Sequence, residues 1–192
     1  VYLKQTGQEG QLRIDSHGTA VGAWTPLGEA AEPAFVTDHL VVRGAGVVAA
    51  PEHQMPVRAT NVSLLEGGML THRRTTPEQE YSLLLTVAGT LLIDADSSID
   101  VSTRGYLTGM THGNTVEGGA TGRAGGSYGD YAWGIGFGVN EPYGVRENPN
   151  EPGAGGGTAF ADPGSADASG GGLIRIAAGT LTVHGTIAAD GH

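Results

Sequence analysis

Apolar and polar positions alternate along the first hundred residues in short runs, and turn residues separate these runs. A period of two is typical of β-strands, whose successive side chains point to opposite faces. In the clearest run, residues 81–101, Leu83, Leu85 and Val87 share one face. Leucines and β-branched residues dominate the runs, and the breaks fall at prolines and glycine pairs. The predicted strand segments are residues 11–15, 35–50, 57–71, 81–101 and 173–189.

No window of the sequence carries a sustained apolar repeat at helical spacing. Glycine accounts for 34 of the 192 residues, and each glycine inside a helix costs about 0.5–1 kcal/mol relative to alanine. The composition also lacks the three-residue period of collagen. The fold class predicted from these features is all-β.

An internal echo refines that prediction. The segment Ala88-Gly89-Thr90-Leu91 recurs as residues 178–181, and an alternating apolar stretch follows each copy. The pattern is a unit of strand, bend, strand and turn that repeats at intervals of about 20–25 residues. Such a repeat predicts a parallel β-solenoid, in which glycines such as Gly89, Gly179 and Gly185 lie where the backbone turns. A β-sandwich is the alternative, since it also uses short alternating strands.

A glycine-rich insertion separates the two best copies of the echo. Of the 34 glycines, 24 lie from Gly105 onward. The predicted organisation is one domain, with solenoid coils over residues 1–105, the insertion over 106–171 and a C-terminal coil over 172–192. Low-complexity disorder is one interpretation of the insertion. The interleaved aromatic residues favour the other, a compact excursion from one coil in which aromatics cover closely spaced glycine backbone; they are Tyr106, Tyr128, Tyr131, Trp133, Phe137, Tyr143 and Phe160.

Four segments, residues 99–106, 125–129, 170–176 and 179–187, give the chain a resemblance to known proteins. The sequence resembles the glycine-rich segments of very large bacterial secreted and cell-surface proteins, in the style of adhesins and autotransporter passengers. That resemblance implies a right-handed parallel β-helix and an extracellular or cell-surface location. It carries no catalytic signature, so it implies no functional residues.

Charge and composition narrow the set of partners. The chain has 20 acidic and 10 basic residues and a net charge of −10, which disfavours nucleic acid and anionic membrane surfaces. It has no run of the roughly 18 apolar residues that a membrane span needs, so no membrane insertion is expected. With no cysteine, disulfides and thiolate metal sites are excluded. The chain shows no signal peptide and begins at Val1, which leads us to expect a processed or excised piece.

The densest acidic cluster is Asp94, Asp96 and Asp100. Carboxylates two positions apart on a strand point to the same side, and such oxygens suit Ca²⁺. The spacing does not match an EF-hand loop, and a solvated strand face is the other interpretation. The seven histidines form neither HxH nor HExxH, so zinc is not expected. Apart from this calcium candidate, no cofactor is predicted.

The aromatic residues of the insertion are the predicted interaction site. Tyr128, Tyr131, Trp133 and Phe137 lie among glycines and polar residues, a setting suited to stacking on sugar rings or on a neighbouring subunit. Packing against the solenoid is the competing interpretation.

A solenoid polysaccharide lyase or glycoside hydrolase would instead need carboxylates on adjacent coils, for which the candidates are Asp38 with His39 and Asp94 with Asp96. Surface solvation explains those residues equally, and no enzymatic activity is predicted.

The C-terminal strand segment, residues 173–189, has no capping helix and no charged or proline-rich blunting. An open solenoid end presents unpaired backbone donors and acceptors. We therefore expect either a longer chain or a homo-oligomer or polymer assembled end to end, as a filament, surface layer or adhesive fibre. A carbohydrate-binding adhesin module and a polysaccharide-degrading enzyme remain the alternative functions.

Overall fold

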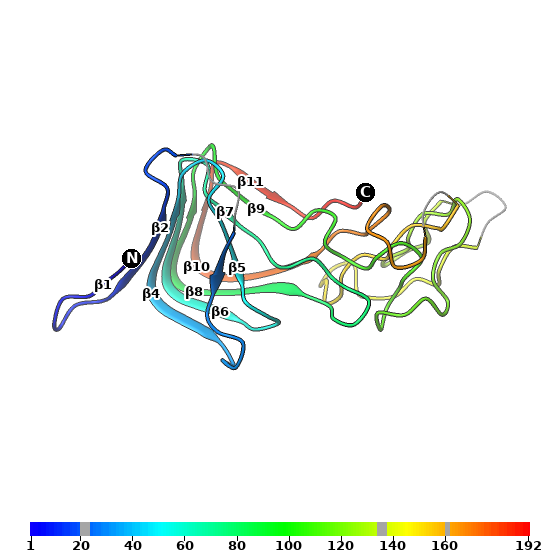
Figure 1. The fold of residues 1–192 in the computed structure, drawn as a ribbon, viewed down its shortest axis with the longest axis horizontal. Helices are drawn as coiled ribbons and strands as arrows, with labels where there is room; N and C mark the ends of the chain where they lie inside the picture. Colours follow the sequence, from blue (N-terminus) through cyan, green and yellow to red (C-terminus); the bar gives the residue numbers. More distant parts are fainter. Residues whose placement is uncertain (20–23, 134–137, 160–161) are drawn as a thin grey trace. The chain divides into compact units, whose positions relative to one another are not determined.

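A computed structural model describes residues 1–19, 24–133, 138–159 and 162–192 (Figure 1). Those residues form strands, turns and irregular segments but no helix, which confirms the all-β prediction. It follows that no helix of the described chain is long and apolar enough to cross a membrane. The two residues Phe137 and Phe160 fall outside the described residues.

The strands form two sheets, and the chain passes alternately from one sheet to the other (Figure 1). The first sheet has the order β1 (Tyr2–Leu3), β2 (Gln11–Asp15), β4 (Phe35–Arg43), β6 (Val57–Leu65), β8 (Ser82–Ile93) and β10 (Leu173–Val183). The second has the order β11 (Thr186–Ala188), β9 (Ser98–Asp100), β7 (Met69–Leu70), β5 (Val48–Pro51) and β3 (Trp24–Leu27).

The pairs β2–β4, β4–β6, β6–β8, β3–β5, β5–β7, β7–β9 and β9–β11 are parallel, whereas β1 pairs with β2 antiparallel. Four predicted strand segments each split into two strands, because turns such as the one at Gly44 and Gly46, both with positive φ, send the chain to the other sheet. The prediction missed β1, which is only two residues long, and β3, which contains Pro26. The established architecture is therefore two mostly parallel sheets; a closed solenoid with sheets stacked as in a β-helix is not shown.

Equivalent apolar residues line up across the first sheet. Ile14 pairs with Val42, Val42 with Leu64, and Leu64 with Ile93. The last three side chains are completely buried. Because a strand shifted by one residue would turn its apolar side chains to the other face, this ladder fixes the register. The spacing along the ladder is 22 residues from Val42 to Leu64 but 29 from Leu64 to Ile93, wider than the predicted 20–25.

The two copies of the sequence echo lie side by side. Strand β10 follows β8 in the sheet, and the amide of His184 donates to the carbonyl of Ile93 at 2.8 Å. A Cβ added to Gly179 would lie 2.5 Å from the carbonyl oxygen of Ala88. Gly89 and Gly179 are thus located inside strands, which curve in this sheet (Figure 1), whereas Gly185 lies between β10 and β11.

The chain divides into two compact units. The first comprises Val1–His72, Leu83–Asp100 and Ile176–Ala188 and holds most of both sheets; the second comprises Arg73–Ser82, Val101–Arg175 and Ala189–His192. In the second unit Tyr106, Leu107 and Met110 form the buried apolar cluster, with Tyr143 packed against it.

Glycine backbone contacts organise the second unit. The amide of Gly105 donates to Gly170, and that of Gly153 to Gly171, both at 2.8 Å. A Cβ on Gly155 would lie 1.8 Å from the carbonyl oxygen of Leu107, closer than any real contact. Side chains at such positions would force the backbone segments apart. The described part of the insertion is therefore hydrogen-bonded and packed.

Candidate functional site

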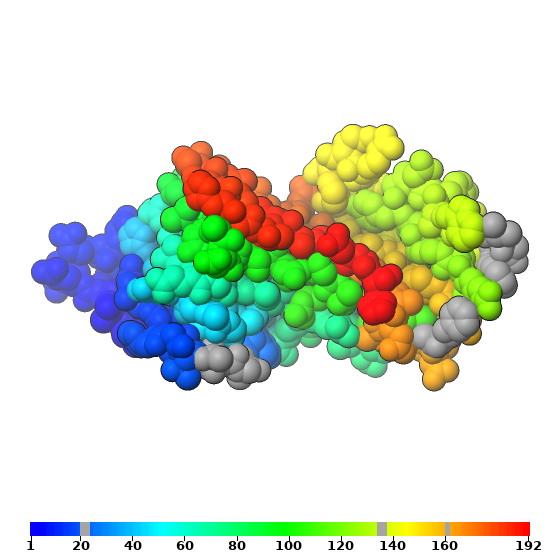
Figure 2. Space-filling view, turned by 90° about the horizontal axis from the view of Figure 1, so that it is seen from above, coloured from blue at the N-terminus to red at the C-terminus, as the bar shows by residue number. Residues whose placement is uncertain are grey.

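Both sheets end on the same pair of strands, β10 and β11, and this edge is apolar. Leu181, Val183 and Ile187 are 50%, 40% and 40% exposed, and we call these three residues the β10/β11 edge. Ile187 pairs with Ile99, which is completely buried. The hydrogen bond from the His184 amide to the Ile93 carbonyl likewise places Val183 beside Ile93, which is completely buried. The strands of this edge, orange to red, form part of the surface of the first unit (Figure 2).

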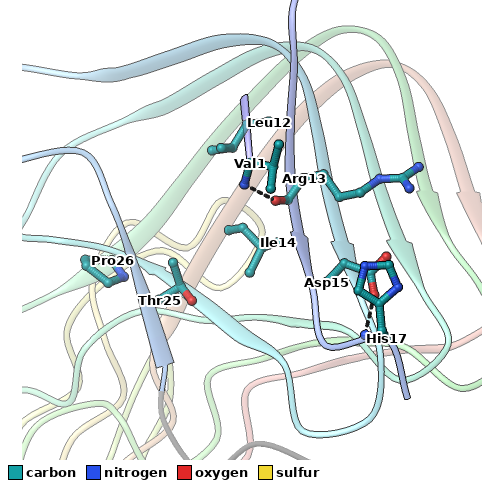
Figure 3. A pocket seen from close by; sticks show the side chains of 8 residues that line it. All are labelled: Val1, Leu12, Arg13, Ile14, Asp15, His17, Thr25 and Pro26. Atoms are coloured by element: carbon teal, nitrogen blue, oxygen red, sulfur yellow. Dashed lines mark hydrogen bonds between the residues drawn. The ribbon is translucent and has the colours of Figure 1, made fainter. Parts of the chain in front are cut away.

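Strand β2 of the first sheet and strand β3 of the second line an open pocket of about 410 Å³, the β2/β3 pocket (Figure 3). Leu12 and Ile14 of β2 point toward β3, where Thr25 and Pro26 lie. The remaining lining residues are Val1, Arg13, Asp15 and His17. Since Leu12 and Ile14 pair with Leu40 and Val42 of the next strand, the pocket exposes the first rung of the ladder described above.

The two faces of β2 differ in chemistry. Arg13, Asp15 and His17 lie on the side of the strand away from Leu12 and Ile14 (Figure 3). The backbone nitrogen of Val1 donates to the carbonyl of Arg13 at 2.8 Å, which holds β1 along β2. β1 covers only part of that strand, and β3 is the outermost strand of its sheet. The pocket therefore combines an apolar floor with the outermost strand of the second sheet.

A column of charges follows the strand ends of the first sheet. Arg43 bonds Glu66 through both Nε, at 2.8 Å, and Nη2, at 2.5 Å, and the amide of Glu66 donates to Asp94 at 2.7 Å. The bond from Arg43 holds the pKa of Glu66 below its ordinary value, although burial, Asp15 and Asp94 oppose this. The amide of His17 lowers the pKa of Asp15 in the same way. These hydrogen bonds connect the ends of β4, β6 and β8 and so stabilise the turns that follow these strands.

The three predicted calcium ligands have separate environments, and only Asp94 belongs to this column. Burial raises the pKa of Asp94, but hydrogen bonds from Ser97 and from the amides of Glu66 and Asp96 outweigh it and leave the pKa lowered. Asp96 is exposed, and the carbonyl of Asp100 accepts from the Thr71 hydroxyl. Within the described ranges no three His, Asp or Glu side chains are grouped to hold a metal ion. Calcium binding at Asp94, Asp96 and Asp100 stays a prediction.

The second unit contains a buried polar cluster that the sequence pattern did not reveal. The completely buried Tyr106 places its hydroxyl 2.9 Å from Glu80 Oε2 and 3.0 Å from Glu151 Oε2. Burial and these two carboxylates raise its pKa. His112 Nδ1 lies 3.5 Å from Glu151 Oε2. With its hydroxyl out of solvent, Tyr106 ties two distant segments together and is not placed to act on a substrate.

The predicted aromatic site divides into two parts. Tyr128 packs edge to face on Tyr143, with ring centroids 5.3 Å apart, and Tyr143 stacks on His112. Tyr131 and Trp133 are instead 59% and 74% exposed. The structure thus separates Tyr128, a packing residue, from Tyr131 and Trp133; the predicted Phe137 lies outside the described residues.

The predicted acid–base pair Asp38 and His39 does not converge on a common point. The carboxylate of Asp38 accepts the amide of Gly10 at 2.7 Å. His39 lies between Glu9, at 2.6 Å, and Asn61, at 3.1 Å. Asn61 in turn accepts the amide of Thr90, so these side chains link neighbouring strands.

Comparisons with protein-family models, curated proteins and solved structures gave no match to this chain.

Proposed function

We propose that this protein is a structural β-solenoid unit that assembles end to end into a filament, surface layer or adhesive fibre at the cell exterior. In this proposal each successive pair of strands, one from each sheet, is one coil. The observation that carries it is the exposure of the β10/β11 edge, whose Ile187 pairs with the fully buried Ile99. The edge has the pattern of an interior rung, and none of the described strands covers it.

The opposite edge offers a complementary surface. The β2/β3 pocket has an apolar floor of Leu12 and Ile14, and β3 is the outermost strand of its sheet. A second copy of the chain, placed with its β10/β11 edge on this pocket, continues the ladder. Because the side chains of the β10/β11 edge are 40–50% exposed, burying the rest of each would contribute roughly half of the 1.5–3 kcal/mol that full burial gives. A contact between two different surfaces does not close on itself, so repetition produces a filament.

The test compares Leu181→Glu with Val36→Glu by sedimentation velocity and negative-stain microscopy over a range of protein concentrations. Both positions are exposed and apolar, but Val36 lies in β4, which is not an outermost strand of its sheet, and pairs with Arg58 of β6. We expect the wild type and Val36→Glu to form concentration-dependent linear assemblies and Leu181→Glu to stay monomeric.

Two results would overturn the proposal. One is a wild-type protein that remains monomeric at the highest concentration reached. The other is a Leu181→Glu variant that assembles as the wild type does, since the apolar edge would then be uninvolved.

A further inference from the structure

We propose that Tyr131 and Trp133 form a binding platform for neutral polysaccharides. This site is in the second compact unit, and its function is independent of end-to-end assembly. Both side chains are large, aromatic and mostly exposed, at 59% and 74%. Ala132 between them is half-buried, and its Cβ lies 3.2 Å from the position that a Cβ on Gly125 would take. The two aromatic neighbours are therefore more exposed than the residue between them.

A buried frame holds this segment in place. Asn140, 1% exposed, accepts the amide of Ser127 at 2.7 Å and donates to the carbonyl of Ser127 at 3.1 Å. The Ser127 hydroxyl then accepts the amide of Ala132 at 3.0 Å. The amide of Gly125 adds a bond to the carbonyl of Trp133 at 3.2 Å. Exposed rings on a backbone fixed in this way lose little conformational freedom when a ligand binds.

The chemistry around the rings fits a carbohydrate. The Tyr131 hydroxyl donates to Glu141 Oε2 at 2.6 Å, which fixes the orientation of the ring. A carboxylate has about four acceptor positions, so Glu141 can accept further hydrogen bonds from sugar hydroxyls. Aromatic faces supply an apolar surface for the C–H side of a pyranose, and the polar rim supplies hydrogen bonds.

Charge selects the class of polysaccharide. Asp130 precedes Tyr131 in the chain, Glu141 accepts the hydrogen bond of the Tyr131 hydroxyl, and the protein as a whole carries a net charge of −10. Uronate and sulfated polymers would be repelled by these carboxylates. A protein partner would need roughly 1,000 Å² of complementary surface, whereas two aromatic rings among glycines and charged residues offer a narrower contact. The occupant with the best fit is a neutral pyranose chain.

The test uses the two tryptophans of the chain, Trp24 and Trp133. In a Trp24→Phe background Trp133 is the sole reporter, and its fluorescence is titrated with cellohexaose, mannohexaose and chitohexaose, with hexagalacturonate as the anionic comparison. Isothermal titration calorimetry then compares the wild type with Trp133→Ala and with the matched control Trp24→Ala.

We expect a saturable change in Trp133 emission with at least one neutral hexasaccharide and at least tenfold weaker binding of hexagalacturonate. Trp133→Ala should lower the affinity at least tenfold, and Trp24→Ala should change it less than twofold. The absence of saturation with all three neutral sugars, or equal affinity of Trp133→Ala and the wild type, would overturn the proposal. Loss of self-association in Trp133→Ala with unchanged sugar binding would assign the rings to a protein contact instead.

Discussion

At the scale of single residues, Gly155 shows what glycine does in the second unit. Its amide donates to Met110, and its Cα lies so close to the chain at Leu107 that a Cβ would fall 1.8 Å from a carbonyl oxygen. Gly155→Ala should lower the free energy of unfolding by about 1–3 kcal/mol, because the backbone has to move apart. Gly191→Ala, where the nearest atom lies at 3.7 Å, should change it by less than about 0.5 kcal/mol. Urea denaturation of both variants tests this contrast, and equal effects would contradict it.

Tyr106 is the second informative residue. Its single hydroxyl proton serves two carboxylates, Glu80 and Glu151. In Tyr106→Phe both lose this donor while the ring stays, so we expect a loss of about 1–3 kcal/mol, as for buried polar groups left without a partner. Tyr131→Phe removes an exposed hydroxyl that also bonds a carboxylate and should cost much less. Thermal denaturation of the two variants gives the comparison; a Tyr106→Phe protein as stable as the wild type would contradict the tying role.

At the scale of the elements, the two copies of the echo offer a matched pair of leucines. Leu91 in β8 is completely buried, and Leu181 in β10 is half exposed. Leu91→Ala should cost about 2–5 kcal/mol of stability because it leaves a cavity. Leu181→Ala should cost under about 1 kcal/mol in dilute, monomeric protein, since little packing is lost. Chemical denaturation at low concentration measures both, and a large loss for Leu181→Ala would mean that β10 is packed in the monomer.

The charge column at the strand ends gives the first unit a dependence on pH. Asp15, Glu66 and Asp94 all have pKa values below their ordinary 3.8 to 4.5. A carboxyl with a lower pKa in the folded state stabilises the fold above its ordinary pKa, and this contribution disappears as the pH falls below it. The melting temperature should therefore drop below about pH 4.5. Melting curves followed by circular dichroism should show a smaller acid-induced drop in melting temperature for Asp94→Asn than for the exposed control Asp96→Asn. Identical pH profiles of the two variants would mean that Asp94 does not contribute to this pH dependence.

The sequence pattern predicted the strands better than it predicted the site. Alternation located β2 at its observed bounds, and the echo identified β8 and β10 as neighbours although the insertion separates them. It missed β3, because Pro26 argues against a strand unless the strand lies at a sheet edge, as this one does. The hydrogen bonds from the Tyr106 hydroxyl to Glu80 and Glu151 could not be predicted, since these two residues are far apart in the chain and belong to no repeated motif.

At the scale of the whole molecule, a charge of −10 sets the conditions for assembly. Copies of an acidic protein repel one another, and salt screens this repulsion over about 8 Å at physiological ionic strength. The proposed contact between the β10/β11 edge and the β2/β3 pocket is mainly apolar and therefore persists in salt. We expect the assembled fraction to rise between 20 and about 300 mM salt, the range over which the screening length shrinks most. Light scattering across that range checks the direction, and assembly that weakens with salt would indicate a contact between opposite charges.

A mixture of two blocked variants tests whether the contact joins unlike ends. Leu181→Glu blocks the β10/β11 edge and leaves the pocket intact, whereas Thr25→Arg fills the β2/β3 pocket and leaves the edge intact. Each variant alone should be monomeric in sedimentation velocity, because each lacks one of the two surfaces. Mixed together they retain one complete contact, so they should form dimers and nothing longer. Dimers of Thr25→Arg alone would instead show that two β10/β11 edges pair with each other, which would make the assembly a closed dimer in place of a filament.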